Sequence, residues 1–284
     1  NYTRDITNGK RSADLFDLVA YNEDCSFVGA LRFICDLFSL DYYKEPEERP
    51  ESLEILSFVN GLCTENEEFD DTPLKPIDKS VLKYYLPYGN KMFEDDGIPL
   101  DTQYKFNVMY DPYSNRIIIP LHDSLGEIVG LKGRLMKYDL EDYEQKYLYM
   151  TSGFNKSKYL SGLYETYELI KAQGYCLIFE SEKSVMKAYS HGIGSVAILG
   201  CQLSRYQVEL LTRLNVPLIF ALDKDRSLDD IKKECNKFLE QISIWYIYDK
   251  DNLLPDKTAP IDDWDAFQVL KKNNTYKFKK GELK

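Results

Sequence analysis

The sequence contains few of the residues that build metal cages from sulfur and imidazole. It has two histidines and six cysteines among 284 residues, and no two cysteines form a C-x-x-C pair. His122 and His191 are too isolated in the sequence to indicate a zinc site. We expect the cysteines, at positions 25, 35, 63, 176, 201 and 235, to be reduced core residues, as free cysteine usually is.

Long apolar runs and an excess of positive charge are also missing. No apolar stretch reaches the roughly 18 residues of a membrane span, and Asn1-Tyr2-Thr3-Arg4 does not begin a signal peptide. We therefore expect no membrane partner and a cytoplasmic location. The net charge of −11 argues against a protein that coats duplex DNA. It leaves metal-assisted chemistry on nucleotides open, because bound cations reverse the local charge.

What is present is an ordinary globular composition, with 44% hydrophobic and 29% charged residues, long enough for more than one domain. Helical spacing predicts a helix over 13–21 and a second that Ser26 caps. The charged, proline-containing stretch 43–51 is typical of a linker and places a boundary near residue 45. Beyond it we expect a short helix at 80–85 and a hairpin of strands 116–121 and 127–131.

From residue 157 onward, helical and strand-like segments alternate. Predicted helices cover 163–172, 181–190, 204–214 and 228–242, and predicted strands cover 175–179, 195–199, 217–222 and 244–248. Such alternation indicates a mostly parallel sheet with helices on both faces. The expected domains are thus a helical tail (1–44), a mixed α+β subdomain (45–156) and an α/β domain (157–284).

Carboxylates follow two of the predicted strands. Glu180 comes directly after strand 175–179, and Asp223-Lys224-Asp225 comes after strand 217–222. Because parallel strands share one crevice at their carboxyl ends, these acids predict a divalent metal site. A helix N-cap or loop role is the alternative for each acid. Asp249-Lys250-Asp251 repeats the same local pattern and is a rival ligand pair.

The strand-end acids, together with Asp263-Trp264-Asp265, resemble the metal-binding carboxylates of a TOPRIM domain. Three upstream blocks, in order, resemble bacterial-type DNA primases: 116–134, 145–152 and 154–164. The resemblance covers roughly residues 95–270, and the start of the sequence resembles the helical tail of the zinc-binding domain that precedes such cores. It implies a mixed N-terminal subdomain followed by a Rossmann-like, mostly parallel TOPRIM sheet.

The resemblance also implies roles for the acids. Glu180, Asp223 and Asp225 would be catalytic and would bind Mg²⁺ or Mn²⁺, with Asp263 and Asp265 completing the metal site. Asp262 is adjacent, so a shift of one residue changes the last pair. Zinc is expected only if a zinc-binding domain lies upstream, and the missing initial methionine indicates a piece of a longer protein.

Arg134, Lys146 and Lys156 match basic positions of the family that face the incoming nucleotide or the template. The expected partners are single-stranded DNA, ribonucleoside triphosphates and a replicative helicase, in a bacterial cell and of host or phage origin. Lys132, Lys137 and Lys158 fit a solvated surface equally well.

Two departures from the family pattern stand out. Ser181 replaces the glycine usually found after the glutamate, and Asp96 stands where an arginine usually precedes a Gly-Ile pair. The leading hypothesis remains the catalytic core of a DNA-dependent primase. A TOPRIM nuclease and a non-catalytic nucleic-acid-binding module are the alternatives. The basic region up to Tyr164 favours synthesis, and the retained acids argue against a non-catalytic module.

Overall fold

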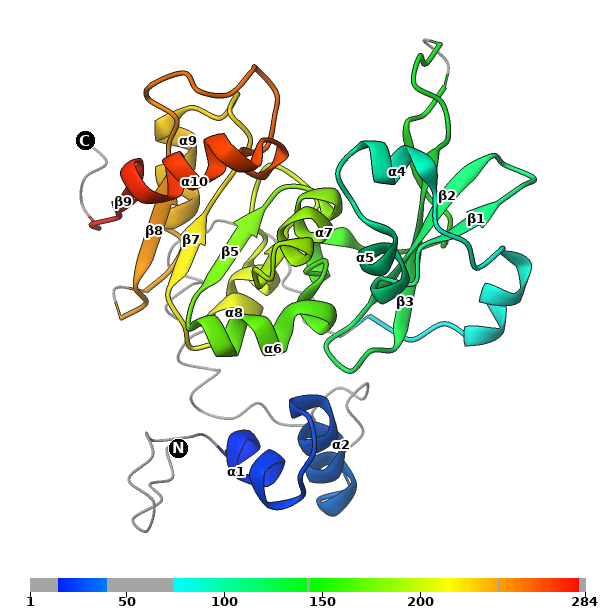
Figure 1. Ribbon diagram of the computed structural model, residues 1–284. Helices are drawn as coiled ribbons and strands as arrows, with labels where there is room; N and C mark the ends of the chain where they lie inside the picture. The colour runs from blue at the N-terminus through cyan, green and yellow to red at the C-terminus, as the bar shows by residue number, and fades with distance from the viewer. Residues whose placement is uncertain (1–14, 40–73, 142–143, 240, 281–284) are drawn as a thin grey trace. The chain divides into compact units, whose positions relative to one another are not determined.

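The computed structural model describes residues 15–39, 74–141, 144–239 and 241–280 (Figure 1). The chain divides into two compact units, Asn1–Lys75 and Pro76–Lys284, which are treated separately below. The linker expected at 43–51 lies outside the described residues. The domain limits at 44/45 and 156/157 therefore stay predictions.

The described part of the first unit is a pair of helices, α1 (Leu15–Asn22) and α2 (Phe27–Leu37). The Ser26 hydroxyl accepts a hydrogen bond from the Gly29 amide at 3.2 Å and caps α2. Ala30 and Ile34 are buried. The predicted helix pair and its serine cap are confirmed.

The second unit begins with a mixed region. Its elements are η1 (Lys79–Tyr84), α4 (Lys91–Asp95), α5 (Leu100–Lys105), β1 (Met109–Asp111), β2 (Arg116–His122), β3 (Ile128–Leu135) and β4 (Tyr147–Tyr149). The strands form an antiparallel sheet in the order β1-β2-β3-β4. Gly126 turns the β2–β3 hairpin at φ 76°, a backbone angle that suits glycine. The hairpin prediction is confirmed.

A second sheet follows, in the order β6-β5-β7-β8-β9. Its strands are β5 (Cys176–Phe179), β6 (Ser195–Ala197), β7 (Leu218–Phe220), β8 (Ile244–Ile247) and β9 (Thr275–Lys277). All pairs are parallel except β8–β9. The interior strand β5 is buried along its whole length, as expected where helices cover both faces.

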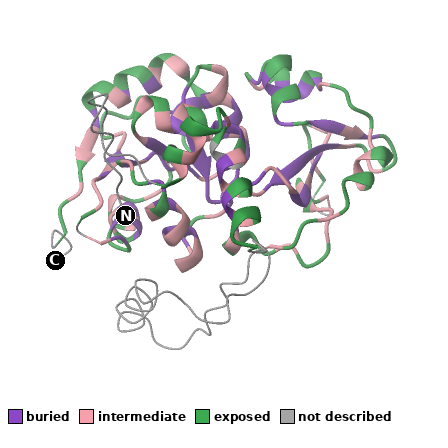
Figure 2. Cartoon of the chain, turned by 90° about the horizontal axis from the view of Figure 1, so that it is seen from below, coloured by how far each residue is buried: buried purple, intermediate pink, exposed green. Residues whose placement is uncertain are grey.

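The helices of this part are η2 (Lys156–Lys158), α6 (Leu163–Gln173), α7 (Glu182–Ser190), α8 (Arg205–Arg213), α9 (Leu228–Cys235), η3 (Pro260–Asp262) and α10 (Trp264–Asn273). The α-helices among them lie on both faces of the second sheet (Figure 1). Buried residues gather on the strands (Figure 2). Among the described residues, no helix combines the length and apolar character that crossing a membrane requires.

Two expectations were wrong. The helix predicted over 228–242 ends at Cys235. The amides of Lys237 and Phe238 bond the carbonyls three residues back, and Phe238 turns into the core, 6.1 Å from the Phe220 ring. Burial of this ring overrides the helical pattern. Cys176 and Cys235 are buried as expected, but Cys201 is exposed.

Candidate metal-binding and catalytic site

Two acids meet at the carboxyl ends of adjacent parallel strands. Glu180 follows β5 directly, and Asp223 follows β7, which pairs with β5 in parallel register. The Asp223 amide donates a hydrogen bond to Glu180 Oε1 at 3.3 Å. The fold therefore brings these two side chains into one crevice.

Burial and the charges of nearby aspartates raise the pKa values of both acids. Burial, then the charges of Asp223 and Asp225, raises the pKa of Glu180 to about 7, while Arg226 opposes the shift. Burial, then the charges of Asp262 and Asp225, raises the pKa of Asp223 to about 6. A site that holds more negative charge than its neighbours neutralise is suited to a cation.

The oxygen donors fit a hard divalent cation. Asp223 Oδ1 is buried and has no hydrogen-bond partner among the described residues. Carboxylate oxygens of this kind are what Mg²⁺ and Mn²⁺ bind in proteins. Across the described ranges, however, no three acidic, histidine or cysteine side chains already form a complete metal cage. The acids thus form an open carboxylate site.

Arg226 is a residue of this site that the sequence analysis did not single out. Its Nε lies 3.5 Å from Glu180 Oε1, and its guanidinium donates to the Cys201 carbonyl. It balances part of the acidic charge. Its place directly after Asp223-Lys224-Asp225 was the signal available in the sequence.

Asp262 is the acid from beyond β8 whose charge acts on Asp223. It accepts hydrogen bonds from Lys187 Nζ at 2.6 Å and from the Ala259 amide at 3.0 Å. Asp263 instead caps α10, accepting from the Ala266 amide at 2.9 Å. Asp265 is exposed in the first turn of α10. Metal binding by Asp263 and Asp265 stays a prediction.

The rival acids Asp249 and Asp251 hold a loop together. The Asp249 carboxylate accepts from the Leu253 and Leu254 amides, each at 2.9 Å, and Lys224 Nζ lies 3.6 Å away. Burial works to raise the pKa of Asp249, but these hydrogen bonds and Lys224 bring it below its ordinary value. Asp251 accepts from Asn274 at 2.9 Å. Asp249 is thus engaged by two amides and a lysine, and Asp251 by one side-chain amide.

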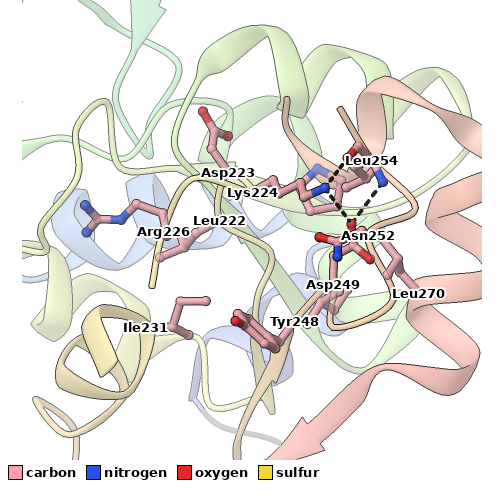
Figure 3. Close-up of a pocket in the computed structure, with 12 residues that line it drawn as sticks. Leu222, Asp223, Lys224, Arg226, Ile231, Tyr248, Asp249, Asn252, Leu254 and Leu270 are labelled. Atoms are coloured by element: carbon pink, nitrogen blue, oxygen red, sulfur yellow. Dashed lines mark hydrogen bonds and ion pairs between the residues drawn. The ribbon is translucent and has the colours of Figure 1, made fainter. Parts of the chain in front are cut away.

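Figure 3 shows this arrangement around a cavity of about 90 Å³, with Lys224 directed at Asp249 and Leu254, and the Asp223 carboxylate pointing away from Asp249. Lys224 thus separates the loop acids from the strand-end acids. The described contacts favour Glu180, Asp223 and Asp262 over the Asp249 pair as neighbours in one site.

The predicted basic residues lie in two places. Arg134, on β3, is buried and donates to the carbonyls of Leu135 and Lys137. Partial burial, then the charges of Arg134 and Lys183, lowers the pKa of Lys146, so these cations lie near one another. Lys156, on η2, lies instead beside Gly200, next to the Cys201 carbonyl that Arg226 contacts.

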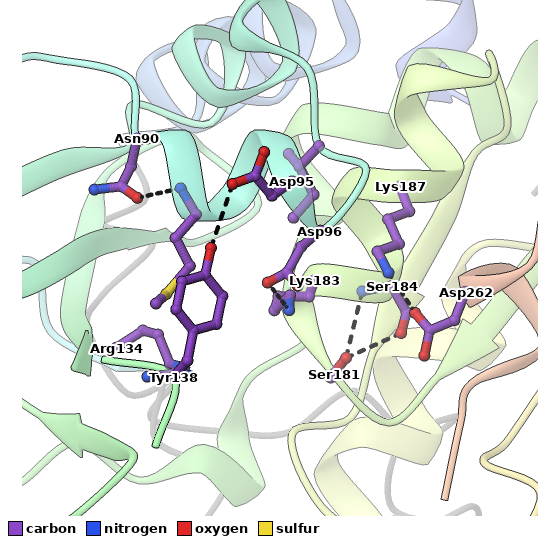
Figure 4. A network of polar contacts seen from close by, with 12 residues as sticks. Asn90, Asp95, Asp96, Arg134, Tyr138, Ser181, Lys183, Ser184, Lys187 and Asp262 are labelled. Carbon is purple, nitrogen blue, oxygen red and sulfur yellow. Dashed lines mark hydrogen bonds and ion pairs between the residues drawn. The ribbon is translucent and has the colours of Figure 1, made fainter. Parts of the chain in front are cut away.

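Three ion pairs connect α7 to other segments. They are Lys132–Glu182, Lys183–Asp96 and Lys187–Asp262. Figure 4 shows Lys183 and Lys187 directed from α7 toward the two aspartates. The pair with Lys183 gives Asp96 a partner at the position where the family has an arginine. For Lys132 the sequence left a solvated surface position open, and the structure excludes it, because the side chain is only 12% exposed.

Ser181 is explained by the structure. Its hydroxyl accepts from the Ser184 amide at 3.3 Å and caps α7, with φ −121°. That backbone angle suits any residue, so the position does not need glycine here.

Residues 87–167 match the family described as the DNA primase catalytic core, N-terminal domain. The chain is related to DNA primases. The SPbeta prophage-derived uncharacterized protein YorJ of Bacillus subtilis is 27% identical over 217 residues, covering 66% of this chain and 57% of that protein. A DNA primase from Neisseria meningitidis is 32% identical over 148 residues, covering 51% of this chain and 24% of that enzyme. The chain thus spans less than two thirds of each relative.

Two solved structures share the fold. The zinc-binding and RNA polymerase domains of Aquifex aeolicus primase align with a TM-score of 0.57 at 19% identity, covering 94% of this chain and 72% of that one. A DnaG primase catalytic domain bound to single-stranded DNA aligns with a TM-score of 0.54 at 18% identity, covering 70% and 77%. The predicted fold class, a mixed subdomain followed by a mostly parallel primase-type sheet, is confirmed.

Proposed function

We propose that this chain is the catalytic core of a DNA-dependent primase that makes short RNA primers on single-stranded DNA by nucleotidyl transfer. The observation that carries the proposal is the pair Glu180 and Asp223 at adjacent strand ends, in a unit whose residues 87–167 match the primase core family. Primases among the relatives support synthesis over the nuclease alternative.

Glu180, Asp223 and Asp225 are the proposed holders of Mg²⁺ or Mn²⁺, and the charge of Asp262 acts on Asp223. A bound divalent cation would lower the pKa of the attacking 3′-hydroxyl and neutralise charge on the triphosphate. The chain contributes the carboxylates, of which Glu180 and Asp223 are partly buried. Zinc belongs to the proposal only for an upstream zinc-binding domain.

Glu180 is suited to proton handling as well as to metal binding. With a pKa of about 7, its carboxyl group is close to half protonated at neutral pH in the metal-free protein. Arg226, 3.5 Å away, favours the ionised form. The same carboxylate can therefore accept a proton when the site lacks a cation and can bind the cation once deprotonated.

The basic residues are proposed to face phosphate. Lys146 is exposed, directly precedes β4 in the chain and lies near Arg134 and Lys183. Lys156 lies beside Gly200, and Arg226 contacts the carbonyl of the next residue, Cys201. Positive charge at these places stabilises the charge of a triphosphate or a template backbone. Arg134 donates to backbone carbonyls. Its proposed role therefore also includes stabilising the end of the β2–β3 hairpin.

Single-stranded DNA is the proposed template, supported by a fold relative solved with single-stranded DNA bound. Ribonucleoside triphosphates are the proposed substrates. A replicative helicase is the proposed partner, and the bacterial cytoplasm the proposed location. These proposals rest on the function of the relatives, of whose length the chain spans less than two thirds.

The deciding experiment supplies single-stranded DNA, the four ribonucleoside triphosphates and Mg²⁺ or Mn²⁺. We expect oligoribonucleotides from the wild type and from Asp229→Asn, an exposed acid on α9, and none from Asp223→Asn. DNA degradation by the wild type without oligoribonucleotides would establish the nuclease instead. Template binding without either product would establish the non-catalytic module.

A further inference from the structure

A buried ion pair joins the first sheet to the helix that follows the metal-binding acid. Lys132 Nζ, from β3, lies 2.7 Å from Glu182 Oε2, at the first residue of α7. The side chains are only 12% and 2% exposed. Both residues belong to the same compact unit. A pair this deeply buried differs in kind from a surface salt bridge.

The surroundings of Lys132 fix its ammonium group in place. The ammonium lies 4.5 Å from the centroid of the Tyr147 ring and 5.8 Å from that of Tyr149. Both tyrosines are on β4, where Tyr149 is the register partner of Lys132. Aromatic faces attract cations. The two rings and the Glu182 carboxylate therefore surround the ammonium group from both elements.

Glu182 lies two residues after Glu180 in the chain. Glu180 directly follows strand β5, Ser181 caps α7, and Glu182 begins the helix. The cap hydrogen bond to the Ser184 amide fixes the chain between them. A force that holds Glu182 therefore also holds the segment that carries the Glu180 carboxylate.

Lys132 lies on the same strand, β3, as Arg134, in the β2–β3 hairpin, which is called the basic hairpin below. Arg134 lies two residues further along β3 and so projects from the same face of the strand. The ion pair thus connects β3, which carries Arg134, to the first residue of α7, which lies two residues after Glu180. Glu182 Oε1 has no other hydrogen-bond partner within the described residues, so loss of Lys132 would leave a buried carboxylate uncompensated.

We propose that Lys132 and Glu182 form a positioning pair, which fixes the Glu180 segment relative to the basic hairpin. The proposal rests on the metal-binding role proposed for Glu180. Lys132 and Glu182 act through the residues they hold and do not touch substrate. The other α7 pairs are more exposed, with 35% exposure for Asp96 and 32% for Asp262, so solvent weakens them more.

The first test measures Mn²⁺ binding to the full chain without nucleotide or DNA, by calorimetry or electron paramagnetic resonance. The variants are Lys132→Met, Glu182→Gln and their double variant. Loss of groups that orient metal ligands weakens metal binding about 10- to 100-fold, and we expect this from each single variant. The double variant should bind Mn²⁺ almost as well as the single variant with the lower Mn²⁺ affinity, because both substitutions remove the same contact.

The matched control is the exposed pair Lys79–Glu127, at 2.9 Å, with side chains 61% and 27% exposed. Lys79→Met and Glu127→Gln should leave Mn²⁺ affinity within about twofold of the wild type. Folding is checked by circular dichroism at the same temperature. An affinity within about twofold of the wild type in folded Lys132→Met and Glu182→Gln would overturn the proposal.

A conservative series separates positioning from folding. Lys132→Arg keeps the charge and can reach Glu182, so it should restore most of the affinity that Lys132→Met loses. If Lys132→Met does not fold, Glu182→Asp decides, because it keeps the charge and shortens the side chain by one methylene. Wild-type Mn²⁺ affinity in Glu182→Asp would then contradict a positioning role.

Primer synthesis by the same proteins distinguishes the two proposals. Weakened Mn²⁺ binding in the variants, with no primers from the wild type, would leave the positioning pair standing and remove the proposed function. Primers from the wild type, together with wild-type Mn²⁺ binding and turnover in Lys132→Met, would remove only the positioning pair. With both proposals correct, kcat should fall more than the KM for nucleotide rises.

Discussion

At the scale of single residues, the site holds carboxyl groups that burial and the charges of nearby acids make hard to ionise. The folded pKa values of Glu180 and Asp223, about 7 and about 6, exceed their ordinary values of 4.5 and 3.8. Between these limits the folded state binds more protons than the unfolded state, so the stability of the metal-free protein falls as pH rises through this window. Cation binding should relieve the repulsion and restore stability.

Removal of one of the two charges should therefore stabilise the metal-free protein. We expect Asp223→Asn to raise the free energy of unfolding at pH 8 by about 1–2 kcal/mol, allowing for partial solvent screening of the charge. Thermal unfolding with a chelator measures the change, and the gain should vanish near pH 4. Asp229→Asn is the control, and a loss of stability in Asp223→Asn at pH 8 would contradict the repulsion.

The affinity for a cation should depend on pH, because the cation must displace a proton from Glu180. Mn²⁺ affinity should rise by up to about tenfold per pH unit between pH 6 and 7 and level off above the pKa of about 7. Calorimetry in buffers of different ionisation enthalpy would measure the released proton. Glu180→Gln should abolish this release, and a pH-independent wild-type affinity would exclude Glu180 as a ligand.

At the scale of elements, the loops after β7 and β8 have similar sequences but use their aspartates differently. The loop after β7 presents Asp223 to Glu180, while the loop after β8 uses Asp249 to hold the Leu253 and Leu254 amides. Asp262, on η3, forms an ion pair with Lys187 of α7. Local sequence repeats Asp-Lys-Asp in both loops, and only the donors that surround each carboxylate separate them.

Substitutions in these loops should divide into two kinds. Asp249→Asn should lower the free energy of unfolding by about 1–3 kcal/mol, because the loop amides lose a charged acceptor, and should leave Mn²⁺ affinity nearly unchanged. Asp262→Asn should weaken Mn²⁺ binding with a smaller effect on stability. Chemical denaturation and metal titration measure the two effects. Asp263→Asn, the cap variant, is the control, and loss of Mn²⁺ binding there would instead support the pair Asp263 and Asp265.

At the scale of the whole molecule, the proposed binding of single-stranded DNA would require an acidic chain to hold a polyanion through local cations. The net charge is −11, so long-range attraction to DNA is weak and the basic residues near the site must supply it. Lys146 and Lys156 have side chains free to approach phosphate. Arg134 is engaged with backbone carbonyls.

Salt dependence tests this division. Single-strand binding should weaken with salt, and Lys146→Met should reduce the slope of log K against log salt by about 0.7, one phosphate contact. Lys105→Met, an exposed lysine at the end of α5, should leave the slope unchanged. Arg134→Met should lower the free energy of unfolding and leave the slope nearly unchanged. Equal slopes for the wild type and Lys146→Met would exclude a phosphate contact at Lys146.

The sequence by itself determined the alternation of helices and strands between residues 163 and 248, the Ser26 cap and the strand-end places of Glu180 and Asp223. These depend on apolar periodicity and cap chemistry, which act over a few residues and are visible in the chain. The upstream blocks added the family. Neither source could show which acid after β8 lies near Asp223, because a shift of one residue leaves the local pattern unchanged.

Only the tertiary structure decided the rest. It buried Lys132 against Glu182, 50 residues away, satisfied Asp249 with loop amides, and ended α9 early so that Phe238 could enter the core. Each outcome depends on a contact between segments far apart in the chain. Such contacts arise when the sheets and helices pack and bury charge, and no local pattern records which partner a side chain will meet.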